Sequence, residues 1–267
     1  MKTHILTRIW RCCRLLIHIM VGLFEATFLF PFRSSSGRVA AIYRWSHTMC
    51  RIFAMDISVA GPVPEAGQRG NTLVVANHVS WLDIFAINAV ATSRFVAKSE
   101  VRGWPVLGWL CARTGTLFVT RERRHDTKRI NKQIAHALHA GDCIAVFPEG
   151  STSDGSDVLV FKASLLQPAI DAEAEVLPIA IRYLDQHGQA SDAAAYIGEM
   201  SLLDSIRRLI AEPRLTVSLT FLPAIHAAHR HRRELAQQAQ QQIAGVVRGE
   251  CARSSAPSAH AITEQAG

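Results

Sequence analysis

Short apolar runs alternate with longer amphipathic stretches along most of this chain. Short apolar runs are typical of buried strands, whereas apolar residues three and four positions apart are typical of helices that cover a sheet. The pattern predicts strands near 57–60, 72–76, 94–97, 116–120, 143–147, 176–182 and 215–221, and helices near 82–91, 104–112, 126–140, 161–172, 201–211 and 229–248. Because strands that alternate with helices form parallel sheets, we expect an α/β fold with a largely parallel sheet flanked by helices.

The first 55 residues do not follow this alternation, and we expect them to form a membrane-associated element of two helices. An apolar run covers 15–30, and a second stretch with helical spacing covers 39–54. The first run has sixteen residues, fewer than the roughly 20 that a bilayer-spanning helix needs. We therefore favour two helices that lie in one leaflet, with their apolar faces in the acyl region.

Other interpretations of this region stay open. A cleaved signal peptide is disfavoured, because no small-residue cleavage site follows the apolar run. A single transmembrane anchor fits the arginines that precede residue 15, but further arginines on the other side of the run argue equally for the cytoplasm there. The stretch 39–54 can also be a core helix that packs on the following domain.

Positive charge is concentrated in the same N-terminal region. Residues 1–51 contain eight Lys and Arg against one acidic residue, Glu25, and so carry the whole formal net charge of +7. The remainder is balanced, so no nucleic acid partner is expected. Arginines beside apolar helices are typical of contact with anionic headgroups. We expect the protein at the inner (cytoplasmic) membrane, with a catalytic domain at 56–250 on the cytoplasmic face and a disordered tail at 251–267.

A histidine and a carboxylate follow the predicted strand at 72–76. His78 and Asp83 are five positions apart, and five residues turn a helix by roughly 500°, so on one continuous helix their side chains would diverge. Ser80 and Asp83 form an S-x-x-D capping signature, which predicts Ser80 at a helix N-cap and His78 in the loop before it. There Asp83 can orient the imidazole for proton removal at neutral pH. An ordinary helix-start histidine with a capping aspartate is the alternative.

Two further predicted strands also end in polar loops. The segment F-P-E-G-S-T-S ends the strand near 143–147, and G-T-L-F-V-T-R ends on Arg121. In open α/β sheets, loops at the carboxyl ends of strands bind ligands. We therefore expect these loops to open on the same edge of the sheet as His78.

The ordered segments N-H-V-S-W-L-D, G-T-L-F-V-T-R, F-P-E-G-S-T-S and V-L-P-I resemble the four blocks of the glycerolipid acyltransferases, which include 1-acylglycerol-3-phosphate acyltransferase. The resemblance runs from about residue 56 to 225, and four blocks in this order are far more specific than H-x4-D alone. It implies acyl transfer from acyl-CoA or acyl carrier protein to the free hydroxyl of a lysophospholipid acceptor at a membrane surface. His78 would be the general base, and Asp83 would hold its imidazole. The substrate-binding residues implied by the resemblance are Lys98, Arg121, Glu149, Gly150, Ser151 and Thr152.

No other catalytic apparatus is expected. The chain has no G-x-S-x-G nucleophile elbow, and Cys143 lies inside a predicted strand, so direct transfer needs no covalent acyl-enzyme. The six cysteines show no C-x-x-C pair, and the twelve histidines include no H-E-x-x-H. We expect no metal and no cofactor, with acyl-CoA or acyl carrier protein as the acyl-donor substrate.

One position departs from the family pattern. Many members read F-P-E-G-T-R, in which the arginine bonds the acceptor phosphate, whereas this chain has Thr152 at that position. Either another cation replaces the arginine or the acceptor carries a different headgroup. The candidate cations are Lys98, Arg121, Arg123, Arg124 and Lys162.

Alternative functions follow from this departure and from the fold. Bacterial lyso-ornithine-lipid acyltransferases are similar around S-T-S-D-G, so lyso-ornithine lipid is the second candidate acceptor. A hydrolase that uses His78 to activate water differs only in what reaches the thioester. A catalytically inactive, membrane-associated lipid-binding protein is the hypothesis of another class, and the intact His78 and Asp83 disfavour it.

Overall fold

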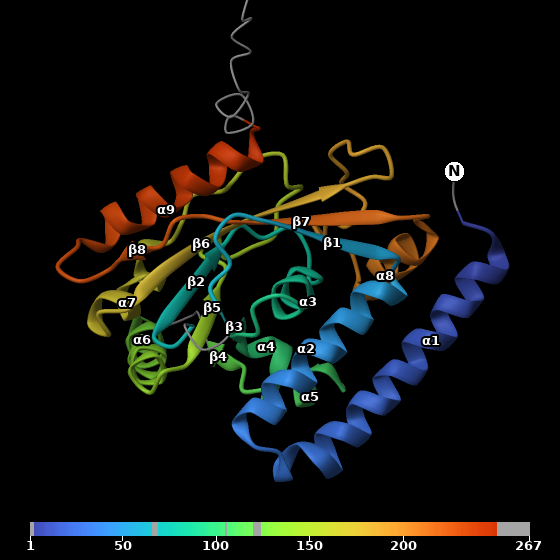
Figure 1. The fold of residues 1–267 in the computed structure, drawn as a ribbon, viewed down its shortest axis with the longest axis horizontal. Coiled ribbons are helices and arrows are strands. Elements are labelled where there is room, and N and C mark those ends of the chain that lie inside the picture. The colour runs from blue at the N-terminus through green and yellow to red at the C-terminus, as the bar shows by residue number, and fades with distance from the viewer. Residues whose placement is uncertain (1–2, 66–68, 105, 120–123, 250–267) are drawn as a thin grey trace, which may run out of the picture.

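The computed structural model describes residues 3–65, 69–104, 106–119 and 124–249. Within these residues, an eight-stranded sheet carries helices on both faces (Figure 1). Along the sheet the strands lie in the order β1 (Met55–Ala60), β7 (Leu215–Phe221), β6 (Glu175–Leu184), β2 (Thr72–Ala76), β5 (Cys143–Val146), β3 (Arg94–Lys98) and β4 (Leu117–Val119), and the short β8 (Ile225–His226) pairs with β6.

The sheet is largely parallel, as the sequence predicts. Strands β6, β2, β5, β3 and β4 run parallel to one another. Strand β7 is antiparallel to β6, and β1 is parallel to β7. Each strand expected from an apolar run is present, and β8 is an addition. The carboxyl ends of β2, β5 and β3 therefore meet at one edge of the sheet.

Helices cover the sheet in two layers. One face carries α2 (Ser35–Ile52), α3 (Asp83–Asn88) and α8 (Leu202–Ala211), and the other carries α6 (Arg124–His139), α7 (Gln167–Asp171) and α9 (Arg232–Val247). Strand β2 is buried throughout because successive side chains face opposite layers. Val74 belongs to the first apolar cluster, and Leu73 and Val75 belong to the second.

Two predicted helices differ in extent from those in the structure. The helix expected near 104–112 is present as α5 (Leu107–Arg113), and a separate short helix, α4 (Ser99–Arg102), precedes it, with Val106 at φ +64° between them. A residue with positive φ cannot continue a right-handed helix. The helix expected near 161–172 is a 3-10 turn, η4 (Ala163–Leu165), followed by α7, where Pro168 stands in the first turn. Proline favours that position because it has no N–H to donate.

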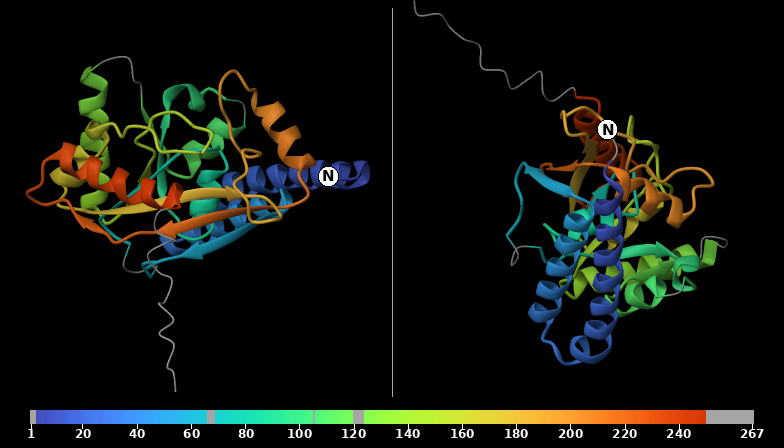
Figure 2. Two further views of the ribbon diagram at one scale, coloured as in Figure 1. Left: turned by 90° about the horizontal axis from the view of Figure 1, so that it is seen from above. Right: turned by 90° about the vertical axis from the view of Figure 1, so that its right-hand side faces the viewer.

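The N-terminal region forms two antiparallel helices that lie side by side (Figures 1 and 2). Helix α1 (Ile5–Phe24) continues through a π-helical turn, η1 (Glu25–Leu29), and a 3-10 turn, η2 (Phe30–Phe32). This helical stretch has 28 residues and contains an 18-residue window with a mean hydropathy of 1.9, so by length and composition it is able to cross a membrane. The sixteen-residue apolar run of the sequence lies inside this longer helical stretch, which extends beyond it at both ends.

Helix α2 belongs partly to the domain core. Its last turns bury Met49, Cys50 and Ile52 in the cluster shared with α3, as the core-helix interpretation predicts. Its first turns leave Val39 and Tyr43 exposed. The tail expected at 251–267 lies outside the described residues.

Candidate active site

His78 lies in the loop between β2 and α3, as the sequence predicts. Asn77, the residue before it, is fully buried, and its amide forms two hydrogen bonds with the backbone of β6. Nδ2 donates to the Ile181 carbonyl (2.9 Å), and the Ile181 N–H donates to Oδ1 (2.7 Å). This pair fixes the start of the loop to the neighbouring strand, so the position of His78 is set by the sheet.

Asp83 orients the imidazole of His78. The distance from His78 Nδ1 to Asp83 Oδ2 is 2.8 Å, and the Asp83 side chain is fully buried. The same oxygen accepts the backbone N–H groups of Val79 (2.8 Å) and Ser80 (3.0 Å). Because Asp83 receives Nδ1–H, Nε2 is left as the ring nitrogen able to accept a proton, and the His78 side chain is 19% exposed.

The predicted N-cap role of Ser80 is wrong in detail. Helix α3 begins at Asp83, and Leu82 occupies the N-cap position without a side-chain hydrogen bond. The Ser80 hydroxyl accepts from the Leu82 N–H at 3.3 Å. The Asp83 side chain instead points back to the preceding loop. There Oδ2 accepts the backbone N–H of Val79 and also lies against Nδ1 of His78, since one carboxylate oxygen can accept several hydrogen bonds.

Tyr183 on β6 is the main site residue that the sequence pattern does not reveal. Its hydroxyl donates to Asp83 Oδ1 at 2.6 Å, and the side chain is buried. The sequence predicts a strand there but gives no sign of the contact, because the two residues are 100 positions apart. Asp83 therefore has donors on both oxygens.

Phe147 stacks on the other side of the imidazole. The ring centroids of His78 and Phe147 are 3.9 Å apart with an interplanar angle of 7°. Phe147 follows directly after β5, whose neighbour in the sheet is β2. The two strand ends thus hold the ring between an aromatic face and a carboxylate.

Glu149 is joined to the same loop. Its Oε1 accepts the His78 backbone N–H at 3.2 Å, and the residue is buried. Burial raises the pKa of the Glu149 carboxyl to about 8, and hydrogen bonding from His78 opposes part of that rise. Among the described residues, Oε2 has no hydrogen-bond partner. At neutral pH the side chain is therefore mainly an uncharged acid beside the site.

Gly150, Ser151 and Thr152 form the turn that follows. Gly150 has φ +79°, and its N–H donates to the Phe147 carbonyl at 3.1 Å, so the turn needs the conformational freedom of glycine. Ser151 is exposed. The Thr152 hydroxyl donates to the Tyr196 carbonyl. The Ser153 N–H donates to the His78 carbonyl at 2.8 Å, which brings the two predicted loops together.

Two predicted substrate-binding residues remain, Lys98 and Arg121. Lys98 is the last residue of β3 and is exposed at the same edge of the sheet. Arg121 lies outside the described residues. Within the described part of the chain, no group of three or more His, Cys, Asp or Glu is arranged to hold a metal ion. Burial raises the pKa of the Cys143 thiol, which disfavours a thiolate nucleophile there.

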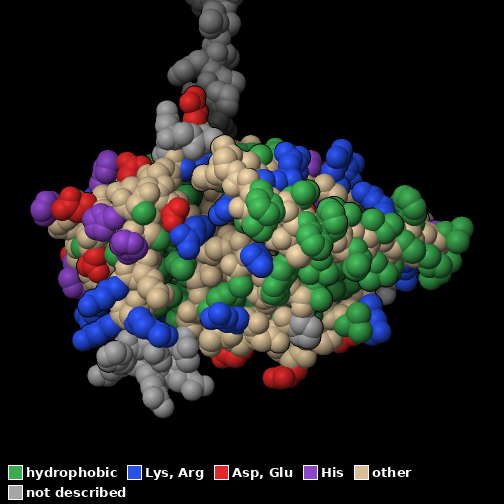
Figure 3. Space-filling model, turned by 90° about the horizontal axis from the view of Figure 1, so that it is seen from below, with side chains coloured by type: hydrophobic (Ala, Val, Ile, Leu, Met, Phe, Trp, Pro, Cys, Tyr) green, Lys and Arg blue, Asp and Glu red, His purple; other side chains and the backbone are tan. Residues whose placement is uncertain are grey.

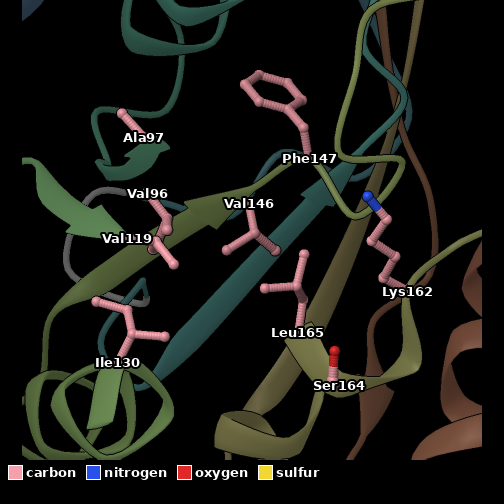
Figure 4. A pocket seen from close by; sticks show the side chains of 9 residues that line it. All are labelled: Val96, Ala97, Val119, Ile130, Val146, Phe147, Lys162, Ser164 and Leu165. Atoms are coloured by element: carbon pink, nitrogen blue, oxygen red, sulfur yellow. The ribbon is translucent and has the colours of Figure 1, made fainter. Parts of the chain in front are cut away.

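A largely aliphatic cavity of about 280 Å³ lies beside Phe147 (Figure 4). Phe147 forms part of its wall and also contacts His78, so the cavity begins one ring away from the imidazole. Its lining residues are Val96, Ala97, Val119, Ile130, Val146, Phe147, Lys162, Ser164 and Leu165. Lys162 and Ser164 bring an amino group and a hydroxyl to this wall.

Comparisons with known proteins find related sequences and a similar fold. A family model described as Acyltransferase matches residues 57–182. The 1-acyl-sn-glycerol-3-phosphate acyltransferase of Neisseria gonorrhoeae is 42% identical over 177 residues, which cover 66% of this chain and 68% of that protein. The lyso-ornithine lipid O-acyltransferase of Pseudomonas aeruginosa is 38% identical over 199 residues, covering 74% and 75%. The crystal structure of the 1-acyl-sn-glycerophosphate (LPA) acyltransferase PlsC from Thermotoga maritima has the same fold, with a TM-score of 0.69, 23% identity and coverage of 94% and 97%.

Proposed function

This chain belongs to the acyltransferase family, and we propose that it transfers a fatty acyl group to the free hydroxyl of 1-acylglycerol-3-phosphate. The acyl donor is acyl-CoA or acyl carrier protein, used as a substrate without a cofactor. The contact between His78 and Asp83 carries this proposal. It leaves Nε2 of the partly exposed His78 side chain able to accept a proton at the edge where the parallel strands end.

The reaction is a direct transfer. Nε2 of His78 removes the proton of the acceptor hydroxyl while Asp83 stabilises the imidazolium that forms. The acceptor oxygen then attacks the thioester carbonyl carbon, a C–O bond forms, and the C–S bond breaks. The departing thiolate takes the proton from the imidazolium, which returns His78 to its starting state. No side chain of the enzyme becomes acylated.

The acceptor headgroup binds beside the Gly150 turn in this proposal. Backbone and hydroxyl groups of Gly150 and Ser151 are suited to oxygen-rich headgroups, and Lys98 supplies positive charge at the same edge. Arg121 has the planar donor fork that suits a phosphate. Glu149 positions the turn through its bond to the His78 backbone.

Lyso-ornithine lipid is the second candidate acceptor, and Thr152 favours it. A threonine has no guanidinium to offer a phosphate, and the Thr152 hydroxyl already donates to the Tyr196 carbonyl. The similarity to the lyso-ornithine lipid O-acyltransferase of Pseudomonas aeruginosa covers about as much of the chain as the match to the Neisseria enzyme. The headgroup is therefore the property to test first.

The exposed apolar side of α1 supports the proposal that the protein acts at a membrane surface. Figure 3 shows a band of apolar side chains across one face of the molecule. The exposed large apolar residues of this helical stretch, here termed the apolar band, are Ile5, Leu6, Ile9, Trp10, Leu16, Ile17, Met20, Val21, Phe24, Phe28, Leu29 and Phe32. A helix with such a face lies stably in the acyl region of a bilayer. We place it in the inner membrane, with the sheet on the cytoplasmic side.

Thiol release measured with full-length protein in lipid vesicles tests this function. Acyl-CoA or acyl carrier protein is supplied as donor, with 1-acylglycerol-3-phosphate, lyso-ornithine lipid or no acceptor. Release that requires 1-acylglycerol-3-phosphate supports the proposal, and release that requires lyso-ornithine lipid selects the second acceptor. Release without acceptor identifies a thioesterase, and no release with either donor identifies a lipid-binding protein.

Replacing His78 tests the assigned base. His78→Ala should reduce turnover by about 10²-fold or more, because general base catalysis contributes 10² to 10⁴. Vesicle association should be unchanged. The matched control is His187→Ala, since His187 is exposed in the turn after β6. Turnover of the His78 variant within a few-fold of the wild type would refute the assignment.

A further inference from the structure

Asp83 has two different sets of donors, one for each oxygen. Oδ2 receives His78 Nδ1 and two backbone N–H groups, so its position is fixed by the loop. Oδ1 receives the Tyr183 hydroxyl at 2.6 Å. The shortness of that bond is typical of a hydroxyl that donates to an ionised carboxylate. Tyr183 is therefore the side chain that holds the far side of the Asp83 carboxylate.

The surroundings of Tyr183 leave its hydroxyl no access to solvent. The side chain is 4% exposed and lies in the cluster between β6, α2 and α3. Burial and the neighbouring Asp83 charge raise the pKa of the Tyr183 hydroxyl well above its ordinary value, so it remains a donor at every pH at which the enzyme works.

We propose that Tyr183 is a positioning residue for acyl transfer, which acts through Asp83 to set both the orientation of the His78 imidazole and its basicity. The inference rests on the proposed role of His78 as the base. A donor on Oδ1 draws negative charge away from Oδ2, and this weakens the stabilisation that Asp83 gives to the imidazolium. Loss of that donor strengthens the pull of Asp83 on the proton of His78.

The other titratable groups near this contact are few among the described residues. Cys50 on α2 faces Tyr183, and burial raises the pKa of its thiol to about 12, so it stays neutral. Glu149 acts on the other side of the loop, and its pKa of about 8 places its titration on the alkaline side. Asp157 interacts with Glu149 from the following loop. The acid limb of the pH profile is therefore the part that reports on the Asp83 contact.

Tyr183→Phe tests the proposal, because it removes the hydroxyl and keeps the ring. We expect kcat to fall about tenfold, equivalent to about 1.4 kcal/mol, with KM within about twofold. The acid limb of kcat/KM against pH should move to higher pH by about half a unit, because Asp83 then stabilises the imidazolium more strongly. The matched control is Tyr43→Phe on the exposed side of α2, which should leave the profile unchanged. An acid limb that stays in place overturns the inference, whether or not kcat falls.

A second experiment keeps the test valid if the Phe variant does not fold. The chain has three tyrosines, so a double variant, Tyr43→Phe with Tyr196→Phe, leaves Tyr183 as the single site for fluorotyrosine. Fluorination makes the phenol a stronger donor, so the acid limb should move to lower pH relative to the same variant with ordinary tyrosine. Coincident acid limbs would overturn the inference.

The His78→Ala variant separates this inference from the proposed function. Turnover that survives in His78→Ala removes the base and with it any role for Tyr183. An inactive His78 variant together with an unchanged Tyr183→Phe profile refutes the positioning role alone.

Discussion

Glu149 is a site residue whose protonation state at neutral pH is set by burial. Its carboxyl accepts the His78 N–H through Oε1, while Oε2 has no partner among the described residues. Loss of water from such a group favours the neutral form, and its pKa rises from 4.5 to about 8. An uncharged Glu149 therefore tethers the His78 loop without placing a second negative charge close to Asp83.

The raised pKa predicts how stability depends on pH. The folded state binds the Glu149 proton up to about pH 8, whereas the unfolded state releases it near 4.5. The folded state thus binds more protons between these values, and its stability falls as pH rises through the interval. Urea denaturation at pH 5, 7 and 8.5 should show that fall in the wild type and a flatter dependence in Glu149→Gln.

The same variant has a consequence for activity. Glutamine resembles the neutral acid, so Glu149→Gln should retain more turnover at pH 7 than Glu149→Ala, which also removes the acceptor for the His78 N–H.

In the denaturation experiment, an equal dependence of the free energy of unfolding on pH in the wild type and in Glu149→Gln would show that Glu149 does not titrate as described.

At the scale of elements, a buried arginine is among the contacts that attach α1 to the main domain. Arg11 donates to the carbonyls of Ile210 (3.0 Å), Glu212 (2.5 Å) and Pro213 (3.1 Å) at the end of α8. The last carbonyls of a helix have no partner within the helix, so a cation there satisfies several of them together. Arg11 thus caps α8 and fixes the direction in which α1 leaves the domain.

Arg11→Ala should loosen this attachment. We expect the free energy of unfolding to fall by roughly 1–3 kcal/mol, the usual cost of hydrogen bonds to a charged group. Limited proteolysis should release the N-terminal helix earlier than in the wild type. Arg44→Ala is the matched control, because Arg44 is exposed on α2. Equal cleavage rates in the two variants would contradict the capping role.

At the scale of the whole molecule, the helix that carries the apolar band and the loop that carries His78 pack against one apolar cluster. Leu15 of α1 and the last turns of α2 pack into the same cluster as Leu82 and Ala86, which adjoin the His78 loop. A membrane contact on α1 therefore bears on the same packed cluster that supports the His78 loop.

Charges placed in the apolar band should separate membrane binding from chemistry. The double variant Leu16→Glu with Met20→Glu should lower vesicle association about tenfold or more, because each large apolar side chain contributes about 1.5–3 kcal/mol when buried. Turnover on vesicle-bound lysolipid should fall in parallel, while turnover on a short-chain, water-soluble acceptor should persist. Val59→Glu, at an exposed apolar position on β1, is the control. Undiminished vesicle binding of the double variant would remove the band from the membrane contact.

The sequence by itself determines the local parts of this protein. The apolar runs place each strand within a few residues, most clearly at β2, which is buried at all of its positions and so has few polar residues. The spacing of His78 and Asp83 places the histidine before its helix, and the structure joins them at 2.8 Å. The resemblance of four ordered motifs indicates the family, which the comparisons confirm.

Only the tertiary structure decides which distant groups meet. Tyr183 reaches Asp83, Phe147 stacks on His78, and Glu149 binds the His78 backbone because β6, β2 and β5 are neighbours in the sheet. Strand order depends on how all the elements pack, and no local period encodes it. The start of α3 also differs from its capping signature, because Asp83 bonds to the loop before it and the helix begins only at Asp83.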